Sequence, residues 1–179
     1  MGIVAVKAVL QPPQEPREVP ADNEAWKSVE DRLGTRLPQD YKAFIELFGT
    51  GSTGGFIWVF NPFSSNKHVN LIEHGRLELG GLASLKEEFP QDYVHDAYPT
   101  PGGLLPFAVT DNGDMLHWKT VGEPDHWTVI VYESRGPKYY GFDGSMTDFL
   151  ASVLTRSVAC DVFPPDFPGD HPTFVPLRE

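Results

Sequence analysis

Residues 37–49 have the sequence LPQDYKAFIELFG, which carries the clearest helical pattern in the chain. Pro38 suits the first turn of a helix, because the backbone N–H that proline lacks has no helical partner there. Asp40 lies near the positive end of the helix dipole, and Gly49 is placed to end the helix. Four apolar residues recur with the helical period: Tyr41, Phe44, Ile45 and Phe48. The pattern therefore predicts an amphipathic helix that buries an aromatic face.

The segments on either side of this helix carry weaker patterns. Before it, three apolar residues have the i, i+3, i+7 spacing of a short helix: Trp26, Val29 and Leu33. Gly34 is placed to end that helix. After it, residues 49–55 are rich in glycine but lack the Lys-Ser/Thr pair of a phosphate-binding loop. Since they lead into the aromatic and β-branched residues 56–60, which predict a strand, they are expected to form a flexible connector.

The middle of the chain has a helical pattern from residue 69 to residue 89. Gly80-Gly81 interrupts it, so two helical pieces are expected, the second ended by Pro90. Residues 91–103 predict a loop.

Strand patterns dominate the next part of the chain, in four segments: 104–110, 115–118, 127–132 and 138–142. Asn112-Gly113 lies between the first two, and Asn-Gly between apolar runs is typical of a β-hairpin because both residues tolerate positive φ. Ser145 then precedes a final helix, with Asp148 three residues on as a near capping box. This order of elements predicts a single α+β domain with a mostly antiparallel central sheet, one face of which is covered by the helices at the two ends of the order.

The ends of the chain differ in composition from residues 26–157, which we take as the domain. Residues 1–25 are expected to form an edge strand or a loosely docked arm, followed by a proline-stiffened connector. Residues 158–179 are expected to form a proline-rich extended tail that wraps the surface. The N-terminus has neither the pattern of a secretory signal nor that of a myristoylation site, which would require Ser or Thr in place of Val6.

The composition excludes several classes of function. The 179 residues include 14 Lys and Arg against 25 Asp and Glu, a formal net charge of -11. Such an acidic chain repels phosphate backbones, so it is not expected to bind nucleic acid directly. The sequence contains no apolar run of the ~20 residues that a membrane span requires. The single Cys160 excludes an internal disulfide and suggests a reducing compartment, so a cytoplasmic location is expected.

Patterns that carry catalysis or bind a metal are missing from the sequence. Its 6 His do not form an H-E-x-x-H motif, and one Cys cannot supply a cysteine-based zinc site. There is no G-x-S-x-G nucleophile motif. Residues 111–114 have the sequence DNGD, but Lys119 occupies the position where a calcium loop requires Glu. We therefore expect no catalytic residues, no metal and no cofactor, and a protein that is not an enzyme.

Three motifs follow one another along the chain: LPQDYKAF (37–44) before a glycine-rich loop and an aromatic strand, LPFA (105–108) leading to DNGD (111–114), and YGF (140–142) before a final helix with Phe149-Leu150. Their order and spacing across residues 26–154 resemble the SUKH superfamily, most closely its Smi/Knr type. The resemblance implies an α+β fold with no catalytic residues. By this resemblance, the chain is similar to many bacterial proteins that act as immunity proteins and neutralise secreted toxins, often nucleases, and to fungal domains that act as regulatory scaffolds in cell-wall signalling.

The acidic charge fits the first of these two functions. A nuclease toxin has a basic active face, which an acidic protein can occupy in place of the polyanion. A binding surface is therefore expected among five residues: Asp92, Asp96, Asp111, Asp114 and Trp118. The alternatives are turn chemistry for each Asp, a position in the core for Trp118, and an acidic excess that only keeps the protein soluble. A cell-wall scaffold without a toxin partner is the alternative function.

Overall fold

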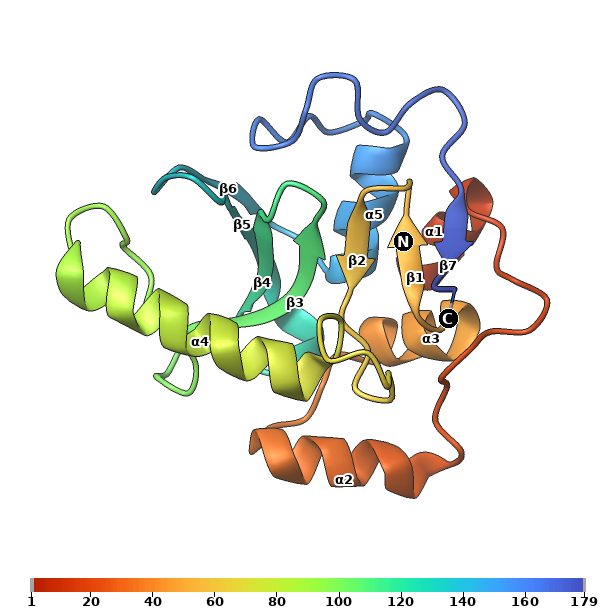
Figure 1. The fold of residues 1–179 in the computed structure, drawn as a ribbon, viewed down its shortest axis with the longest axis horizontal. Coiled ribbons are helices and arrows are strands. Elements are labelled where there is room, and N and C mark those ends of the chain that lie inside the picture. The colour runs from red at the N-terminus through yellow and green to blue at the C-terminus, as the bar shows by residue number, and fades with distance from the viewer. Residues whose placement is uncertain (1, 179) are drawn as a thin grey trace.

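The computed structural model describes residues 2–178 and has an antiparallel sheet at its centre (Figure 1). Its seven strands are β1 (Gly51–Thr53), β2 (Ile57–Val59), β3 (Leu104–Thr110), β4 (Met115–Lys119), β5 (Thr128–Tyr132), β6 (Tyr139–Phe142) and β7 (Phe174–Pro176). The strand order is β6-β5-β4-β3-β2-β1-β7, and every neighbouring pair is antiparallel. The predicted α+β class and the predicted hairpin of residues 104–118 are confirmed.

Five α-helices accompany the sheet: α1 (Gly2–Val9), α2 (Asn23–Leu33), α3 (Gln39–Phe48), α4 (Leu71–Glu88) and α5 (Met146–Leu154). The predicted end of α2, the predicted extent of α3 and the predicted start of α5 are confirmed. Gly34 ends α2 with a φ of 74°, and Pro38 directly precedes α3. The Ser145 side chain accepts a hydrogen bond from the Asp148 backbone N–H at the start of α5. Asp40 also connects two helices, because its Oδ2 accepts hydrogen bonds from the backbone N–H and the hydroxyl of Thr147, at 2.9 and 2.8 Å.

The larger part of the core lies on the face of the sheet that α1, α3 and α5 cover (Figure 1). Tyr41 of α3 packs edge-to-face on Trp118 of β4, with ring centroids 4.9 Å apart, and its hydroxyl donates a hydrogen bond to the Phe60 carbonyl. Burial of an aromatic side chain stabilises a fold by about 1.5–3 kcal/mol. The prediction that helices from both ends of the order of elements cover the same face of the sheet is therefore correct for α3 and α5.

The opposite face of the sheet is covered by α4, which crosses in front of the sheet in Figure 1. Leu82 of α4 packs in a second apolar cluster with Leu104, Ile130 and Tyr132. The side chains of β5 alternate between the two clusters, as strand geometry requires. The domain is thus a sheet between two helical layers.

Helix α4 is continuous, so the expected break at Gly80-Gly81 is wrong. Each glycine costs about 1 kcal/mol in a helix interior. The cap at Asn70, whose side chain accepts hydrogen bonds from two backbone N–H groups, and the burial of Leu71 and Leu82 against the sheet offset this cost.

The glycine-rich segment after α3 is also more ordered than expected. Its residues Gly51–Thr53 form β1, and Gly54-Gly55, with φ of 63° and 66°, turn the chain into β2. A Cβ at Gly51 would lie 2.4 Å from the Val175 carbonyl oxygen, so only glycine allows β7 to approach this closely. The expectation of a flexible connector is therefore wrong for residues 51–53.

The N-terminal residues form α1, so the expectation of an edge strand or a loosely docked arm is wrong. Val6 and Leu10 are fully buried, and α1 packs against α5. The Gly2 backbone N–H donates a hydrogen bond to Asp148 at 2.8 Å. This tertiary packing overrides the strand preference of the valines in the segment.

The C-terminal residues are extended, as predicted, but they do more than wrap the surface. Phe174–Pro176 form the edge strand β7 beside β1. Phe163 and Phe174 are buried in the main core.

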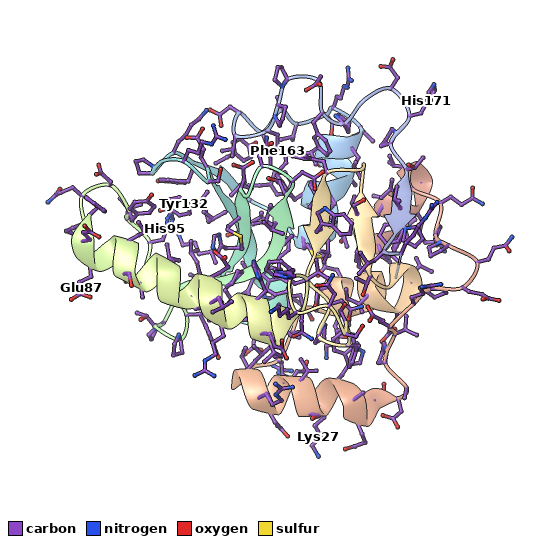
Figure 2. All side chains as sticks on the ribbon, viewed as in Figure 1. Lys27, Glu87, His95, Tyr132, Phe163 and His171 are labelled. Atoms are coloured by element: carbon purple, nitrogen blue, oxygen red, sulfur yellow. The ribbon has the colours of Figure 1, made fainter. Side chains whose placement is uncertain are left out.

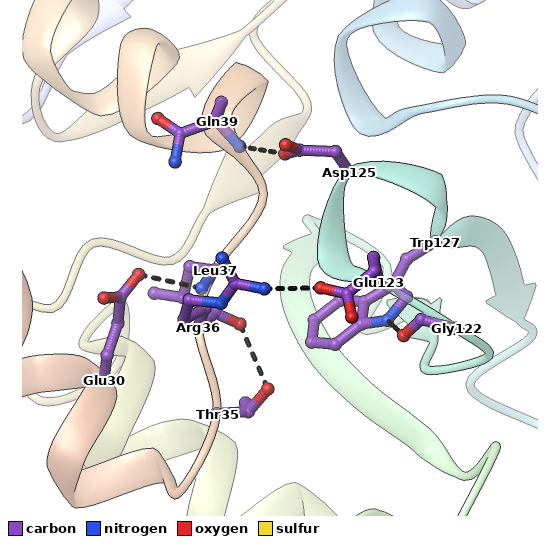
Figure 3. A network of polar contacts seen from close by, with 9 residues as sticks. All are labelled: Glu30, Thr35, Arg36, Leu37, Gln39, Gly122, Glu123, Asp125 and Trp127. Carbon is purple, nitrogen blue, oxygen red and sulfur yellow. Dashed lines mark hydrogen bonds and ion pairs between the residues drawn. The ribbon is translucent and has the colours of Figure 1, made fainter.

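Polar contacts join the linker between α2 and α3 to the β4–β5 connection, which contains the 3-10 helix η1 (Pro124–His126) (Figure 3). Arg36 forms an ion pair with Glu123, and the Gln39 backbone N–H donates a hydrogen bond to Asp125 at 2.7 Å. The Arg36 and Glu123 side chains are 72% and 69% exposed, so their ion pair adds about 1 kcal/mol at most. These contacts fix the position of the linker without forming a site.

Candidate functional site

A groove with a volume of about 150 Å³ lies between α4 and the face of β4 and β5 that α4 covers. We call it the α4 groove. Its helical side includes Glu78, Leu82 and Leu85 of α4 and Tyr93 of the following loop. Its sheet side includes Met115, His117, Tyr132 and Glu133. The groove therefore combines an apolar and aromatic lining with two carboxylates.

Aromatic rings form one wall of the groove and continue beyond it. Tyr93 stacks on Tyr132 with ring centroids 5.6 Å apart, and His95 lies edge-on to both Tyr132 and Tyr139. His95 Nδ1 is 2.9 Å from the Tyr132 hydroxyl, at the left of Figure 2. Stacking and the hydrogen bond hold the loop after α4 against β5 and β6.

His117 is the buried polar residue of the groove, with a side chain that is only 3% exposed. It faces α4 because its neighbours in β4, Leu116 and Trp118, point into the main core. Its Nδ1 makes no hydrogen bond. Burial lowers the pKa of His117 to about 4, so its imidazole is neutral near pH 7. A neutral imidazole has one nitrogen that accepts a hydrogen bond and one that donates.

His95, at the edge of the same aromatic wall, also has a lowered pKa. Burial is the larger cause, and the positive charges of Lys119 and Lys86 add to it. Both histidines beside the groove are thus shifted toward the neutral form. Among residues 2–178, no group of three or more His, Cys, Asp or Glu is arranged to hold a metal ion.

The four predicted aspartates do not gather at one site. Asp92 and Asp96 are exposed in the loop after α4, where Asp96 lies 3.9 Å from Lys86. Asp111 is exposed at the β3–β4 turn and accepts a hydrogen bond from the Trp58 indole at 2.7 Å. Asp114, in the same turn, is buried; it accepts hydrogen bonds from the Thr110 hydroxyl and the Ser134 backbone N–H. Asp114 therefore has the turn role that was the alternative for it.

Trp118 lies in the main core, so the prediction that it anchors a partner at the surface is wrong. Its side chain is fully buried among Tyr41, Phe107 and Trp127. It points inward because β4 is a central strand with both faces covered, and the alternation places Trp118 on the side of α3 and α5.

The residues that line the α4 groove were not among the sequence predictions. One signal was available, since in the strand segment 115–118 a histidine stands between two large apolar residues and must therefore face the other side of the sheet. The contributions of Glu78 and Tyr93 depend on how α4 crosses the sheet, which the sequence pattern does not give.

The model of the SMI1-KNR4 cell-wall family, SUKH_6, matches residues 23–150. The chain belongs to this SUKH family. No curated protein and no solved structure matches the chain. SUKH domains of this family are generally non-catalytic and are in general immunity or cell-wall-related interaction domains. Among residues 2–178, no helix has the length and apolar character needed to cross a membrane.

Proposed function

We propose that this SUKH protein is a bacterial immunity protein that neutralises a basic protein toxin by direct contact. It performs no catalysis, and it acts in the cytoplasm, where the free thiol of Cys160 stays reduced. Its partner surface is the α4 groove with the exposed residues around it.

The observation that carries the proposal is the composition of this surface. Large apolar side chains are exposed at the end of α4, in the loop after it and in β6: Leu85 by 37%, Phe89 by 44%, Val94 by 49% and Tyr139 by 44%. Apolar and aromatic anchors with a polar rim are typical of protein interfaces, where a few such residues supply most of the binding energy. The carboxylates of Glu78 and Glu133 in the groove and the net charge of -11 favour a basic partner. A nuclease has such a surface, because it must hold a polyanion.

The test is co-expression with the product of the neighbouring gene. We expect that product to be basic, to arrest growth when expressed alone, and to be harmless when this protein is co-expressed. The purified pair should form a complex measurable by calorimetry. A neighbouring product that neither binds nor is toxic would contradict the proposal.

Paired variants locate the surface. Phe89→Ala with Tyr139→Ala should raise the Kd at least about tenfold, as expected for interface anchors. Val19→Ala with Val121→Ala removes two other exposed apolar side chains and should leave the Kd unchanged. Equal effects of the two pairs would exclude the α4 groove as the interface.

A second candidate function is a scaffold in cell-wall regulation, which the description of the matching family favours. Capture of a cell-wall synthesis protein, together with the absence of any toxic neighbouring gene product, would favour the scaffold over the immunity protein.

A further inference from the structure

We propose that the α4 groove receives one arginine side chain of the partner protein. The proposal rests on the proposed function, since it names the chemical group through which a basic partner is recognised. Three properties of the groove support it: its size, the carboxylates in its lining, and a buried imidazole nitrogen that makes no hydrogen bond.

The size of the groove fits one side chain. Its volume of about 150 Å³ is well below the roughly 300–1,000 Å³ of pockets that hold drug-sized ligands. The lining includes the apolar atoms of Leu82, Leu85 and Met115 and the ring of Tyr93. The aliphatic part of an arginine can pack on such atoms, while its planar guanidinium can stack on an aromatic ring.

Two carboxylates at the groove determine the sign of the charge it accepts. Within residues 2–178, no Lys or Arg forms an ion pair with Glu78 or Glu133. The imidazole of His74 lies 3.4 Å from Glu78, on the helix side. Lys86 of the same helix is held elsewhere, by the Val94 carbonyl at 3.0 Å and by Asp96. An incoming cation therefore does not have to displace a lysine or an arginine.

His117 supplies an independent observation that points to a ligand. It lines the groove, is 3% exposed and has no hydrogen-bond partner at Nδ1. A buried polar atom without a partner is unfavourable, and a ligand that supplies the missing hydrogen bond removes this cost. A guanidinium has five N–H donors in a fixed plane, more than the three partners offered by the two carboxylates and a ring nitrogen, whereas a lysine ammonium has three donors at one point. For this reason the groove favours arginine over lysine.

The test uses the peptide acetyl-Gly-Arg-Gly-amide as the probe and ¹⁵N NMR of the full chain as the readout. We expect saturable shifts of the Gly81, Gly113 and Ser134 amides, which border the groove, with a Kd in the millimolar range typical of one side chain. The matched citrulline peptide, which lacks the charge, should bind at least about tenfold more weakly, and the lysine peptide should also bind more weakly. Equal binding of citrulline or lysine, or shifts only elsewhere, would overturn the proposal.

Variants separate this inference from the proposed function. Glu78→Gln with Glu133→Gln should weaken binding of the arginine peptide at least about tenfold. The control Glu24→Gln with Asp31→Asn removes the same charge from α2 and should have no effect. If the toxin still binds the Glu78 and Glu133 variant with unchanged Kd and the peptide does not bind the natural protein, the arginine site is wrong and the immunity function stands. If the peptide binds in the groove but no toxin binds the protein, the immunity function fails alone.

Discussion

Glu18 has a φ of 58°, a conformation that residues other than glycine seldom adopt. Its carboxylate accepts three hydrogen bonds of 2.7 Å, from the Thr50 hydroxyl and from the backbone N–H and the hydroxyl of Ser65. Burial alone would raise the pKa of Glu18, but hydrogen bonds, the largest from the Ser65 backbone, outweigh it and lower the pKa to about 2. The ionised carboxylate thus joins the N-terminal connector to two loops of the domain.

Glu18→Gln is expected to lower the free energy of unfolding by about 1–2 kcal/mol near pH 7, because it removes charge-assisted hydrogen bonds. The folded pKa is depressed below its ordinary 4.5, so this contribution is complete above about pH 4.5 and is lost as the pH falls toward 2. Urea unfolding of both proteins at several pH values measures the difference. Glu15→Gln, at an exposed position, is the control. A difference that does not shrink in acid would contradict the prediction.

His117 is the second residue whose protonation is linked to stability. Its folded pKa of about 4 lies below the ordinary 6.5. Below pH 6.5 the unfolded chain therefore binds a proton that the folded chain does not, and stability is lost as the pH falls from about 6.5 to about 4. The loss attributable to this residue is on the order of 3 kcal/mol.

His117→Leu should flatten the decline of stability between about pH 6.5 and pH 4, because leucine does not titrate. Denaturant unfolding of the variant and the natural protein across this interval provides the measurement. His171→Gln, which changes an exposed histidine, should keep the natural pH dependence. Parallel curves for the natural protein and His117→Leu would show that burial of the imidazole does not govern acid sensitivity.

At the scale of elements, α4 is the most informative, because glycines that disfavour a helix lie inside a continuous one. A Cβ at Gly80 would meet no atom within 4 Å, and its backbone is helical. Gly80→Ala is therefore expected to raise the free energy of unfolding by about 0.5–1 kcal/mol, by reducing the freedom of the unfolded chain. Thermal and urea unfolding of the variant and the natural protein measure this change in the free energy of unfolding.

Gly49→Ala provides the contrast, because a Cβ at Gly49 would lie 2.2 Å from the Arg17 carbonyl oxygen and φ there is 68°. This substitution should destabilise the protein by more than about 1 kcal/mol. If both alanine variants had the same effect, the positive φ and the close Arg17 backbone at Gly49 would not determine the cost of the added Cβ.

The elements that the sequence predicts well are those whose patterns are local. Helix α3 has its own aromatic stripe and terminal glycine, and the Asn112-Gly113 turn specifies the β3–β4 hairpin. Strand β1 and helix α1 escape prediction because neighbours distant in sequence define them: β1 lies between β2 and β7, and α1 is held by α5. The α4 groove escapes for the same reason, since its walls meet only when α4 crosses the sheet.

At the scale of the whole molecule, the net charge of -11 affects the rate of association. A basic partner is attracted over a distance set by the screening length, which is about 10 Å at 0.1 M salt and about 3 Å at 1 M. The association rate constant with the toxin should therefore fall at least about tenfold over this range, while the dissociation rate changes less. Stopped-flow fluorescence can measure both. An association rate indifferent to salt would remove electrostatic steering from the proposed function.

The position of β7 at the edge of the sheet has a consequence for biosynthesis. Strand β1 can pair with β2 as soon as both leave the ribosome, but its other side stays open until residues 174–176 emerge. During that interval the nascent chain exposes unpaired backbone groups that strands of other chains can bind. Slow translation of the residues that precede β7 would lengthen the interval, so we expect the yield of soluble protein to depend on how quickly β7 emerges.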